Sequence, residues 1–204
     1  MARLYFYYAA MNAGKSTTLL QADFNYRERG MGTMLWTAAH DERSGAGRIA
    51  SRIGLEAAAH AYGPTTDLVD EVLLEIKERD VDCVLVDEAQ FLSRDQVLQL
   101  ARLADEIGMP VLCYGLRTDF LGNLFPGSAA LLAIADALIE LKAVCECGRK
   151  ATMNLRVDAE GHSVSSGAQT EIGGNDRYLA LCRRHFMERL RESEAHQLSL
   201  GFPR

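Results

Sequence analysis

The sequence has no long apolar segment, no excess of positive charge and no cysteine framework of the secreted type. A transmembrane helix needs roughly 20 consecutive apolar residues, and no segment approaches that length. Met1-Ala-Arg-Leu4 leads directly into a strand-like run rather than into a signal peptide. We therefore expect a soluble, cytoplasmic protein that has no membrane partner.

Basic residues are also too few for a general nucleic-acid binder. The 204 residues include 22 Lys and Arg against 28 Asp and Glu, a formal net charge of −6. This balance opposes binding to polyanions and favours a small-molecule substrate. The length allows one α/β domain and a small appendage, and the 48% hydrophobic content is typical of a globular chain.

A glycine-rich junction near the N-terminus indicates a phosphate-binding loop. The apolar run that begins at Tyr5 (YFYYAAMNAGKS) leads into Gly14-Lys15-Ser16. Backbone N–H groups and the helix dipole at such a junction can hold phosphates, while Lys15 reaches the β- and γ-phosphates and Ser16 binds Mg²⁺. The P-loop pattern has glycine where Ala9 stands, and a chance G-K-S at a helix start is the alternative. The predicted loop comprises Ala9, Ala10, Met11, Asn12, Ala13, Gly14, Lys15 and Ser16.

A second motif supports this interpretation. The run Val81–Asp87 (VDCVLVD) is typical of a buried parallel strand that delivers Asp87 to its carboxyl end. The Mg²⁺ of a P-loop nucleotide site requires such an aspartate, and Glu88 follows at the same edge. A solvated strand end is the alternative. Together the two motifs predict nucleoside triphosphate chemistry.

Alternating strands and helices continue to about residue 144, which predicts a parallel sheet with helices on both faces. Thr66 or Asp67 can cap one helix, and Ser93 with Gln96 forms a capping box for another. The segment 41–62 has no firm pattern, so we interpret it as a mobile segment or lid. We expect helices over 15–29, 65–79, 93–107 and 128–136, and strands over 33–39, 81–87, 110–115 and 137–144.

The character of the sequence changes at residue 145, which predicts two domains, 1–144 and 145–204. Cys145-Glu-Cys147 is followed by Cys182-Arg-Arg-His185. Three thiolates and an imidazole in two close pairs fit a structural, tetrahedral Zn²⁺ site, although C-x-C is tighter than the usual spacing. A solvated histidine is the alternative for His185. Cys83 and Cys113 lie in expected core strands.

Between these pairs we expect a β-hairpin and then a binding loop. Residues 153–157 and 162–165 flank the turn-like Asp158-Ala-Glu-Gly161. Residues 165–176 are polar and glycine-rich, and long loops of this kind are usually functional or disordered. Tyr178 adds an aromatic face, so a binding loop is the preferred interpretation.

The motifs AAMNAGKST, LVDEAQF, CYGLRTDF, CECGRK, IGGNDRY and CRRH occur here in order. From about Leu4 to His185 the chain resembles the bacterial thymidine kinases of the family that includes the human cytosolic enzyme. The resemblance implies transfer of the γ-phosphoryl group of ATP to the 5′-hydroxyl of deoxythymidine or deoxyuridine. It also implies a P-loop NTPase-type α/β fold, a small zinc-binding domain, a homotetramer, and inhibition by dTTP.

The resemblance also implies roles for individual residues. Glu88 takes the position of the catalytic base, and Asp87 supports Mg²⁺. Beyond the P-loop, it assigns nucleotide binding to Asp41, Arg43, Asp87, Glu88, Ala89 and Gln90. It assigns the nucleoside pocket to Phe91, Leu116, Phe120, Thr170, Glu171, Ile172, Gly173, Gly174 and Tyr178, with Gln90 close by. For Phe91 and Phe120 a plain core role is the alternative.

Two other classes of function remain open at this point. Asp87-Glu-Ala-Gln90 also resembles the DExx box of helicases, which would make the protein a nucleic-acid-stimulated ATPase. A helicase core needs two such domains and a basic track, and neither the length nor the charge supplies them. A nucleic-acid-binding module is opposed by the nearly neutral segment 145–204.

Overall fold

The computed structural model describes residues 2–40, 45, 47–169 and 177–199, which form parts of two compact units. The first unit comprises Met1–Tyr8, Gly14–Arg117 and Phe125–Leu141. The second comprises Ala9–Ala13, Thr118–Leu124 and Lys142–Arg204. Two short segments that precede residue 144 in the sequence therefore belong to the second unit.

A six-stranded sheet forms the centre of the first unit, in the order β5-β2-β6-β7-β1-β8. Strand β2 pairs in parallel with β5 and β6, β6 with β7, and β1 with β8. The strands are β1 (Leu4–Ala9), β2 (Thr33–Ala38), β5 (His60–Tyr62), β6 (Cys83–Val86), β7 (Val111–Leu116) and β8 (Ala137–Glu140). The predicted parallel sheet is confirmed.

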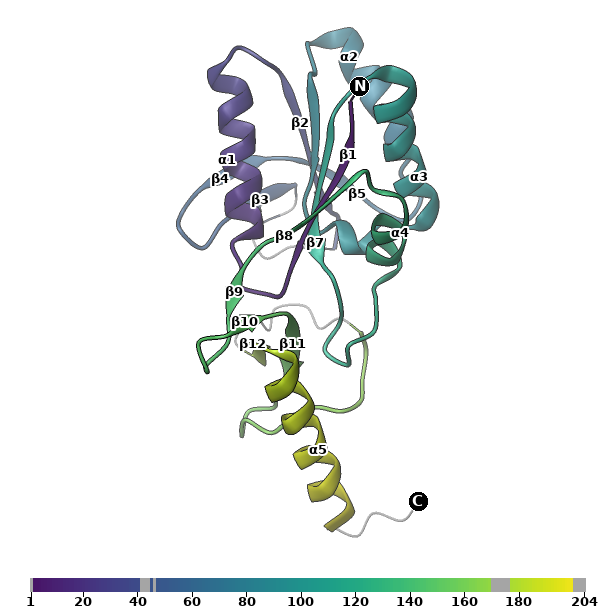
Figure 1. The fold of residues 1–204 in the computed structure, drawn as a ribbon. Coiled ribbons are helices and arrows are strands. Elements are labelled where there is room, and N and C mark those ends of the chain that lie inside the picture. The colour runs from purple at the N-terminus through teal and green to yellow at the C-terminus, as the bar shows by residue number, and fades with distance from the viewer. Residues whose placement is uncertain (1, 41–44, 46, 170–176, 200–204) are drawn as a thin grey trace. The chain divides into compact units, whose positions relative to one another are not determined.

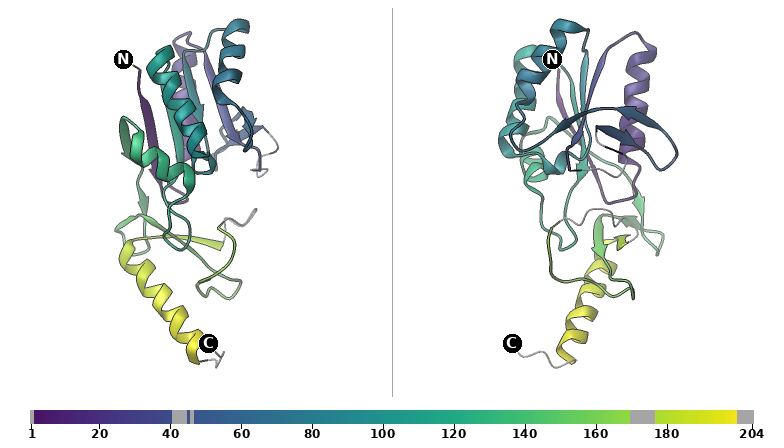
Figure 2. Two further views of the ribbon diagram at one scale, coloured as in Figure 1. Left: turned by 90° about the vertical axis from the view of Figure 1, so that its right-hand side faces the viewer. Right: turned by 180° about the vertical axis from the view of Figure 1, so that it is seen from behind.

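Helices cover both faces of this sheet, as predicted (Figures 1 and 2). Because side chains alternate along a strand, Phe6 and Trp36 pack in one core and Tyr7 and Leu35 in the other. The second core contains Leu19 of α1. The helices are α1 (Lys15–Glu28) on one face, and α2 (Leu68–Glu78), α3 (Arg94–Arg102) and α4 (Pro126–Ile134) on the other.

Local capping explains where these helices begin. The Asp67 side chain accepts from two backbone N–H groups of α2, and Ser93 and Gln96 form the predicted reciprocal capping box at α3. Pro126 occupies the first turn of α4, where its missing N–H has no cost. After α3 the chain continues through a π-helical turn (Leu103–Ile107) to Gly108, which adopts φ 77°. None of the described helices is both long and apolar enough to span a membrane.

Two stretches before residue 145 differ from the sequence pattern. The segment 41–62 has no firm pattern and was interpreted as a mobile segment or lid, yet its residues 48–62 contain three strands: β3 (Arg48–Ala50) pairs with β4 (Glu56–Ala58), and β5 joins the main sheet beside β2. The expected strand 137–144 is divided into β8 and β9 (Ala143–Val144), which belong to different sheets. The residues 41–44, on which the Asp41 and Arg43 assignments fall, lie outside the described part of the chain.

The second unit consists of two small antiparallel sheets and a helix. Strand β9 pairs with β10 (Lys150–Ala151), and β11 (Met153–Arg156) pairs with β12 (Tyr178–Leu181). Helix α5 (Arg183–Ser199) follows β12 directly. Buried residues of all these elements form one core: Ala10, Ala143, Cys145, Ala151, Leu155, Val157, Leu181, Cys182 and Phe186.

The predicted hairpin is confirmed only at its turn. The Asp158 N–H donates to His162 O, and a single bridge joins Val157 to Ser163. The strand partner of β11 is instead β12, because the apolar segment Tyr178–Leu181 (YLAL) can contribute to the core and the polar segment after the turn cannot.

Candidate functional site

The predicted phosphate-binding loop (residues 9–16) includes Gly14 of the first unit, which adopts the left-handed conformation (φ 78°) and precedes α1. This conformation suits glycine and orients the first turn of the helix. The Ser16 hydroxyl donates to Asp87 Oδ2 at 2.8 Å. The residues of the two sequence motifs, 71 positions apart, are therefore in direct contact.

Asp87 follows β6 directly and is 4% exposed. Its Oδ1 accepts from the Glu88 backbone N–H at 3.0 Å, and its own N–H donates to Trp36 O. Burial, together with the nearby Glu88 carboxylate, raises the pKa of the Asp87 carboxyl group, whereas the hydrogen bond from Ser16 and the charge of Lys15 oppose this rise. A divalent cation would offset both causes of the rise, so Ser16 and Asp87 fit a Mg²⁺ site.

Polar contacts from Tyr62 and Gln90 hold Glu88 at the carboxyl edge of the sheet. The Tyr62 hydroxyl donates to Glu88 O at 2.8 Å, and Gln90 Nε2 donates to Glu88 Oε2. Gln90 is fully buried, and its Oε1 accepts from Leu116 N at 3.0 Å. The amide of Gln90 therefore joins the ends of β6 and β7 and orients the Glu88 carboxylate.

Phe91 lies in an aromatic group of the same unit. Its ring contacts His40 edge-on at 4.3 Å between centroids, and Phe125 at 5.7 Å. Phe120, in the second unit, is 1% exposed, and the Arg156 guanidinium covers its ring at 3.7 Å from the centroid. Tyr178 is half-buried in β12. The positions Thr170, Glu171, Ile172, Gly173 and Gly174 lie outside the described residues.

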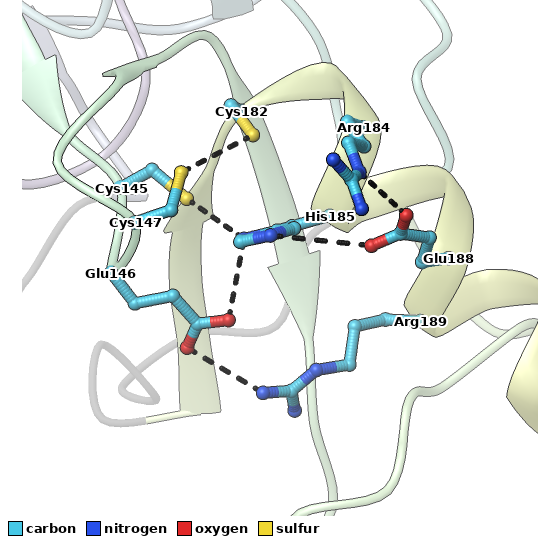
Figure 3. Close-up of polar contacts among 8 residues, drawn as sticks. All are labelled: Cys145, Glu146, Cys147, Cys182, Arg184, His185, Glu188 and Arg189. Atoms are coloured by element: carbon cyan, nitrogen blue, oxygen red, sulfur yellow. Dashed lines mark hydrogen bonds and ion pairs between the residues drawn. The ribbon is translucent and has the colours of Figure 1, made fainter.

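The predicted metal ligands come together in the second unit (Figure 3). The ligand atoms of Cys145, Cys147, Cys182 and His185 all lie within 4.8 Å of one another. Cys145 Sγ is 3.4 Å from His185 Nδ1, and Cys147 Sγ is 3.9 Å from Cys182 Sγ. A tetrahedron built with Zn–S bonds of about 2.3 Å has edges of roughly 3.8 Å, so these residues fit Zn²⁺.

Local structure presents both pairs of ligands. The C-x-C turn closes when Gly148, at φ 77°, donates its N–H to Cys145 O at 2.8 Å. Cys182 and His185 lie at the start of α5, one turn apart (Figure 3). His185 Nε2 faces Glu188 Oε2 at 4.0 Å, as the free nitrogen of a ligating histidine commonly faces a carboxylate.

The thiol pKa values also favour a cation. Burial raises the pKa of Cys145, but the backbone N–H groups of Cys147 and Cys182 outweigh this effect, and its pKa falls to about 6. The Arg149 N–H lowers the pKa of Cys147, yet burial and the two neighbouring thiols raise it overall. Adjacent thiols resist simultaneous ionisation, and a bound divalent metal removes that conflict.

Sequence reasoning missed three residues that organise these sites: Tyr62, Asn154 and Arg156. Tyr62 ends β5, a strand that was not expected. Asn154 and Arg156 are buried polar residues in the strand MNLR. A polar residue at every second position of a short strand was the available signal, since buried polar groups need specific partners.

Comparisons with known proteins agree with the motifs. A family model described as thymidine kinase matches residues 2–186. A thymidine kinase of Novosphingobium aromaticivorans is 72% identical over 92% of this chain and 98% of its own length. Thymidine kinases of Zymomonas mobilis and Jannaschia sp. are 62% and 60% identical over 93% and 92% of this chain, and over 98% and 96% of their own lengths.

Among solved structures, the Pif1 helicase of Candida albicans is similar to this chain with a TM-score of 0.43 and 16% identity, over 70% of this chain and 36% of its own. Similarity this weak is no evidence of a shared activity, and the ATPase alternative gains no support. The thymidine kinase family model matches residues 2–186, and the relatives are highly identical over nearly their whole lengths. The chain therefore belongs to the thymidine kinase family.

Proposed function

We propose that this protein transfers the γ-phosphoryl group of ATP to the 5′-hydroxyl of thymidine or deoxyuridine. The observation that carries the proposal is the contact of Ser16 with Asp87, with Glu88 adjacent and oriented by Gln90. The loop hydroxyl, the strand-end carboxylate and a second carboxylate are the groups that phosphoryl transfer to an alcohol requires. Family membership points to thymidine as the alcohol.

Each residue has a role that follows from its chemistry. Lys15 and the backbone of the loop hold the triphosphate, and Ser16 and Asp87 hold Mg²⁺, which neutralises phosphate charge when it is bound. Glu88 accepts the 5′-hydroxyl proton and orients the oxygen. Because phosphoryl transfer is largely dissociative, positioning and charge provide most of the acceleration. Arg43 is proposed to stabilise developing charge, and Asp41 to lie near the phosphates.

The finer assignments belong to the same proposal. Residues up to 144 bind ATP, and residues 145–204 carry structural Zn²⁺ and the loop that reads the base. Phe91, Leu116, Phe120 and Tyr178, with residues 170–174, surround the nucleoside. The enzyme is a cytoplasmic homotetramer. It is inhibited by dTTP, which carries both a thymine base and a triphosphate.

The test is consumption of ATP with Mg²⁺ over a panel of ribo- and deoxynucleosides, with DNA, RNA and no-acceptor controls. Turnover confined to thymidine and deoxyuridine, with the 5′-monophosphate as product, supports the proposal. Turnover without a nucleoside, or only with nucleic acid, refutes it and makes Glu88 an activator of water.

A further inference from the structure

Strand β11 presents two polar side chains on one buried face. Asn154 and Arg156 are 2% and 6% exposed, and Leu155 between them packs in the core of the second unit. Alternation along a strand places residues 154 and 156 on the same side. Burying an amide and a guanidinium is costly unless each has defined partners, so their contacts indicate their role.

Asn154 joins two segments that are distant in sequence. Its Oδ1 accepts from the Met11 backbone N–H at 2.7 Å, and its Nδ2 donates to Thr118 O at 3.1 Å. Met11 lies in the middle of the nucleotide loop, and Thr118 immediately precedes Asp119-Phe120. One side-chain amide thus fixes a peptide group of the loop and the start of the segment 118–124.

The nucleotide loop contains a left-handed residue beside this contact. Asn12, the residue after Met11, has φ 64°, a conformation that asparagine adopts more readily than most other non-glycine residues. Contacts of the neighbouring residues help to decide that the loop adopts it. The hydrogen bond from Met11 to Asn154 fixes the peptide group between Ala10 and Met11, and Ala10 packs in the core of the second unit.

Arg156 fixes a second pair of segments. Its guanidinium lies over the Phe120 ring at 3.7 Å from the centroid, while Nη1 donates to Ala168 O at 3.0 Å and Nη2 to Ser166 O at 2.9 Å. Gly167, between these carbonyls, has φ 126°, and a Cβ there would lie 2.6 Å from Arg156 Nη2. The chain therefore bends around the guanidinium only because residue 167 is glycine.

Residues 166–169, the stem of the predicted nucleoside loop, have a second attachment. Asp119 is 5% exposed, and its Oδ1 accepts from the Leu121 and Asn123 N–H groups. Its Oδ2 accepts from Gln169 Nε2 at 3.0 Å. The segment 118–124 and the stem 166–169 are thus held together at Arg156 and at Asp119.

We propose that this face of β11 is the positioning element for both substrates: Asn154 sets the conformation of the nucleotide loop, and Arg156 sets Phe120 and the stem of the nucleoside loop. The inference rests on the proposed function, because it takes residues 9–16 to bind ATP and Phe120 with the loop to bind thymidine. Neither side chain touches a reacting atom, so each acts through the segment that it holds.

The test is a comparison of Asn154→Leu and Arg156→Met in the full-length, zinc-loaded protein, with calorimetric Kd values for MgATP and thymidine beside kcat and KM. Asn154→Leu is expected to weaken ATP binding roughly five- to tenfold, as loss of one buried hydrogen bond would. Arg156→Met is expected to weaken thymidine binding at least tenfold, with ATP affinity within about twofold of wild type. Matched exposed controls, Asn25→Leu and Arg94→Met, should change neither Kd.

Asn154→Leu should act on ATP binding and Arg156→Met on thymidine binding. A purely structural role would not separate the two affinities in this way. Equal losses for both substrates in both variants, or wild-type affinities in both, would overturn the proposal. Arg156→Lys should recover part of the thymidine affinity, and Gly167→Ala should reproduce the Arg156→Met effect. If Asn154→Leu does not fold, Asn154→Ala replaces it; this change also removes the acceptor for Met11, so ATP affinity should fall by roughly the same five- to tenfold.

Failure of the proposed function would be visible separately. Wild-type protein that binds ATP but neither binds nor phosphorylates thymidine would refute the function before any variant is measured. Wild-type protein that phosphorylates thymidine, with variants that show no difference between the substrates, would refute only the role of β11.

Discussion

Glu88 has a left-handed backbone conformation, with φ 52°. For a non-glycine residue this costs about 1–2 kcal/mol, and it is maintained by the Tyr62 hydroxyl on Glu88 O and by Gln90 on its carboxylate. Strained residues cluster at functional sites, where the surrounding structure fixes them. With this backbone conformation, the chain at Glu88 leaves the extended course of β6.

We expect Glu88→Gln to lower kcat by about 10²-fold or more, because the amide cannot accept the 5′-hydroxyl proton. ATP affinity should be nearly unchanged, since the P-loop contacts remain. Steady-state kinetics and calorimetry on purified protein provide the test. Glu71→Gln, on an exposed turn of α2, is the control, and wild-type turnover by the Glu88 variant would remove Glu88 from the role of base.

Asp87 links stability to pH in the protein without Mg²⁺. Burial and the Glu88 charge raise its pKa above the ordinary carboxyl value of about 4. A raised pKa means that the folded state binds this proton more tightly than the unfolded state does. The stabilising contribution is therefore complete below about pH 4 and is lost as the pH rises through the raised value.

Asp87→Asn should accordingly raise Tm at pH 8 relative to wild type, while the difference shrinks towards pH 4. The variant should also lose the Tm increase that MgATP gives to the wild-type protein, and nearly all of its turnover. Differential scanning fluorimetry across this pH range, with and without MgATP, measures both effects. A lower Tm for the variant at pH 8 would show that the buried carboxylate is not destabilising.

Among the helices and strands, those with a clear local pattern could be predicted from the sequence. The apolar spacing and the Ser93–Gln96 capping box specify α3 by themselves, and the VDCVLVD run specifies β6. Strand β5 was missed because three residues, His60–Tyr62, carry no periodic signal and are ordered by pairing with β2. Tertiary pairing of this kind overrides local propensity.

The same distinction holds for the candidate site. The contact between Ser16 and Asp87 could be predicted because both residues belong to motifs at strand ends. Asn154 and Arg156 could not be assigned, because their partners are reached only after β11 has paired with β12 rather than with the nearer segment. A pattern can show that a buried polar residue needs a partner, but only the fold supplies the partner.

The Cys/His cluster should determine whether the second unit folds. Metal competes with protons for thiolate and imidazole ligands, so zinc should be released progressively as the pH falls. Cys182→Ser should contain well under one zinc per chain and should be cleaved by trypsin within 142–199 before the first unit is cleaved. Metal analysis and mass spectrometry of the fragments test this. Cys113→Ala, in a core strand of the first unit, should retain full zinc.

At the scale of the whole molecule, two features of the first unit support self-association. Strand β8 lies at one edge of the six-stranded sheet, and its Leu138 is 48% exposed. On α2, Leu74 is 56% exposed. Edge strands offer backbone groups for pairing, and exposed apolar side chains in a folded protein often mark interfaces.

For the proposed homotetramer, sedimentation equilibrium should give a mass four times that of the 22.5 kDa chain. Leu138→Glu should lower that mass, because a carboxylate at a strand–strand contact would have to lose its hydration. Leu55→Glu, at a similarly exposed apolar position between β3 and β4, should leave the mass unchanged.

If the wild type is a monomer at micromolar concentration, the tetramer is refuted. If Leu138→Glu is still a tetramer, the interface lies elsewhere. Should Leu138→Glu dissociate the tetramer and keep wild-type kcat, each chain must contain a complete active site.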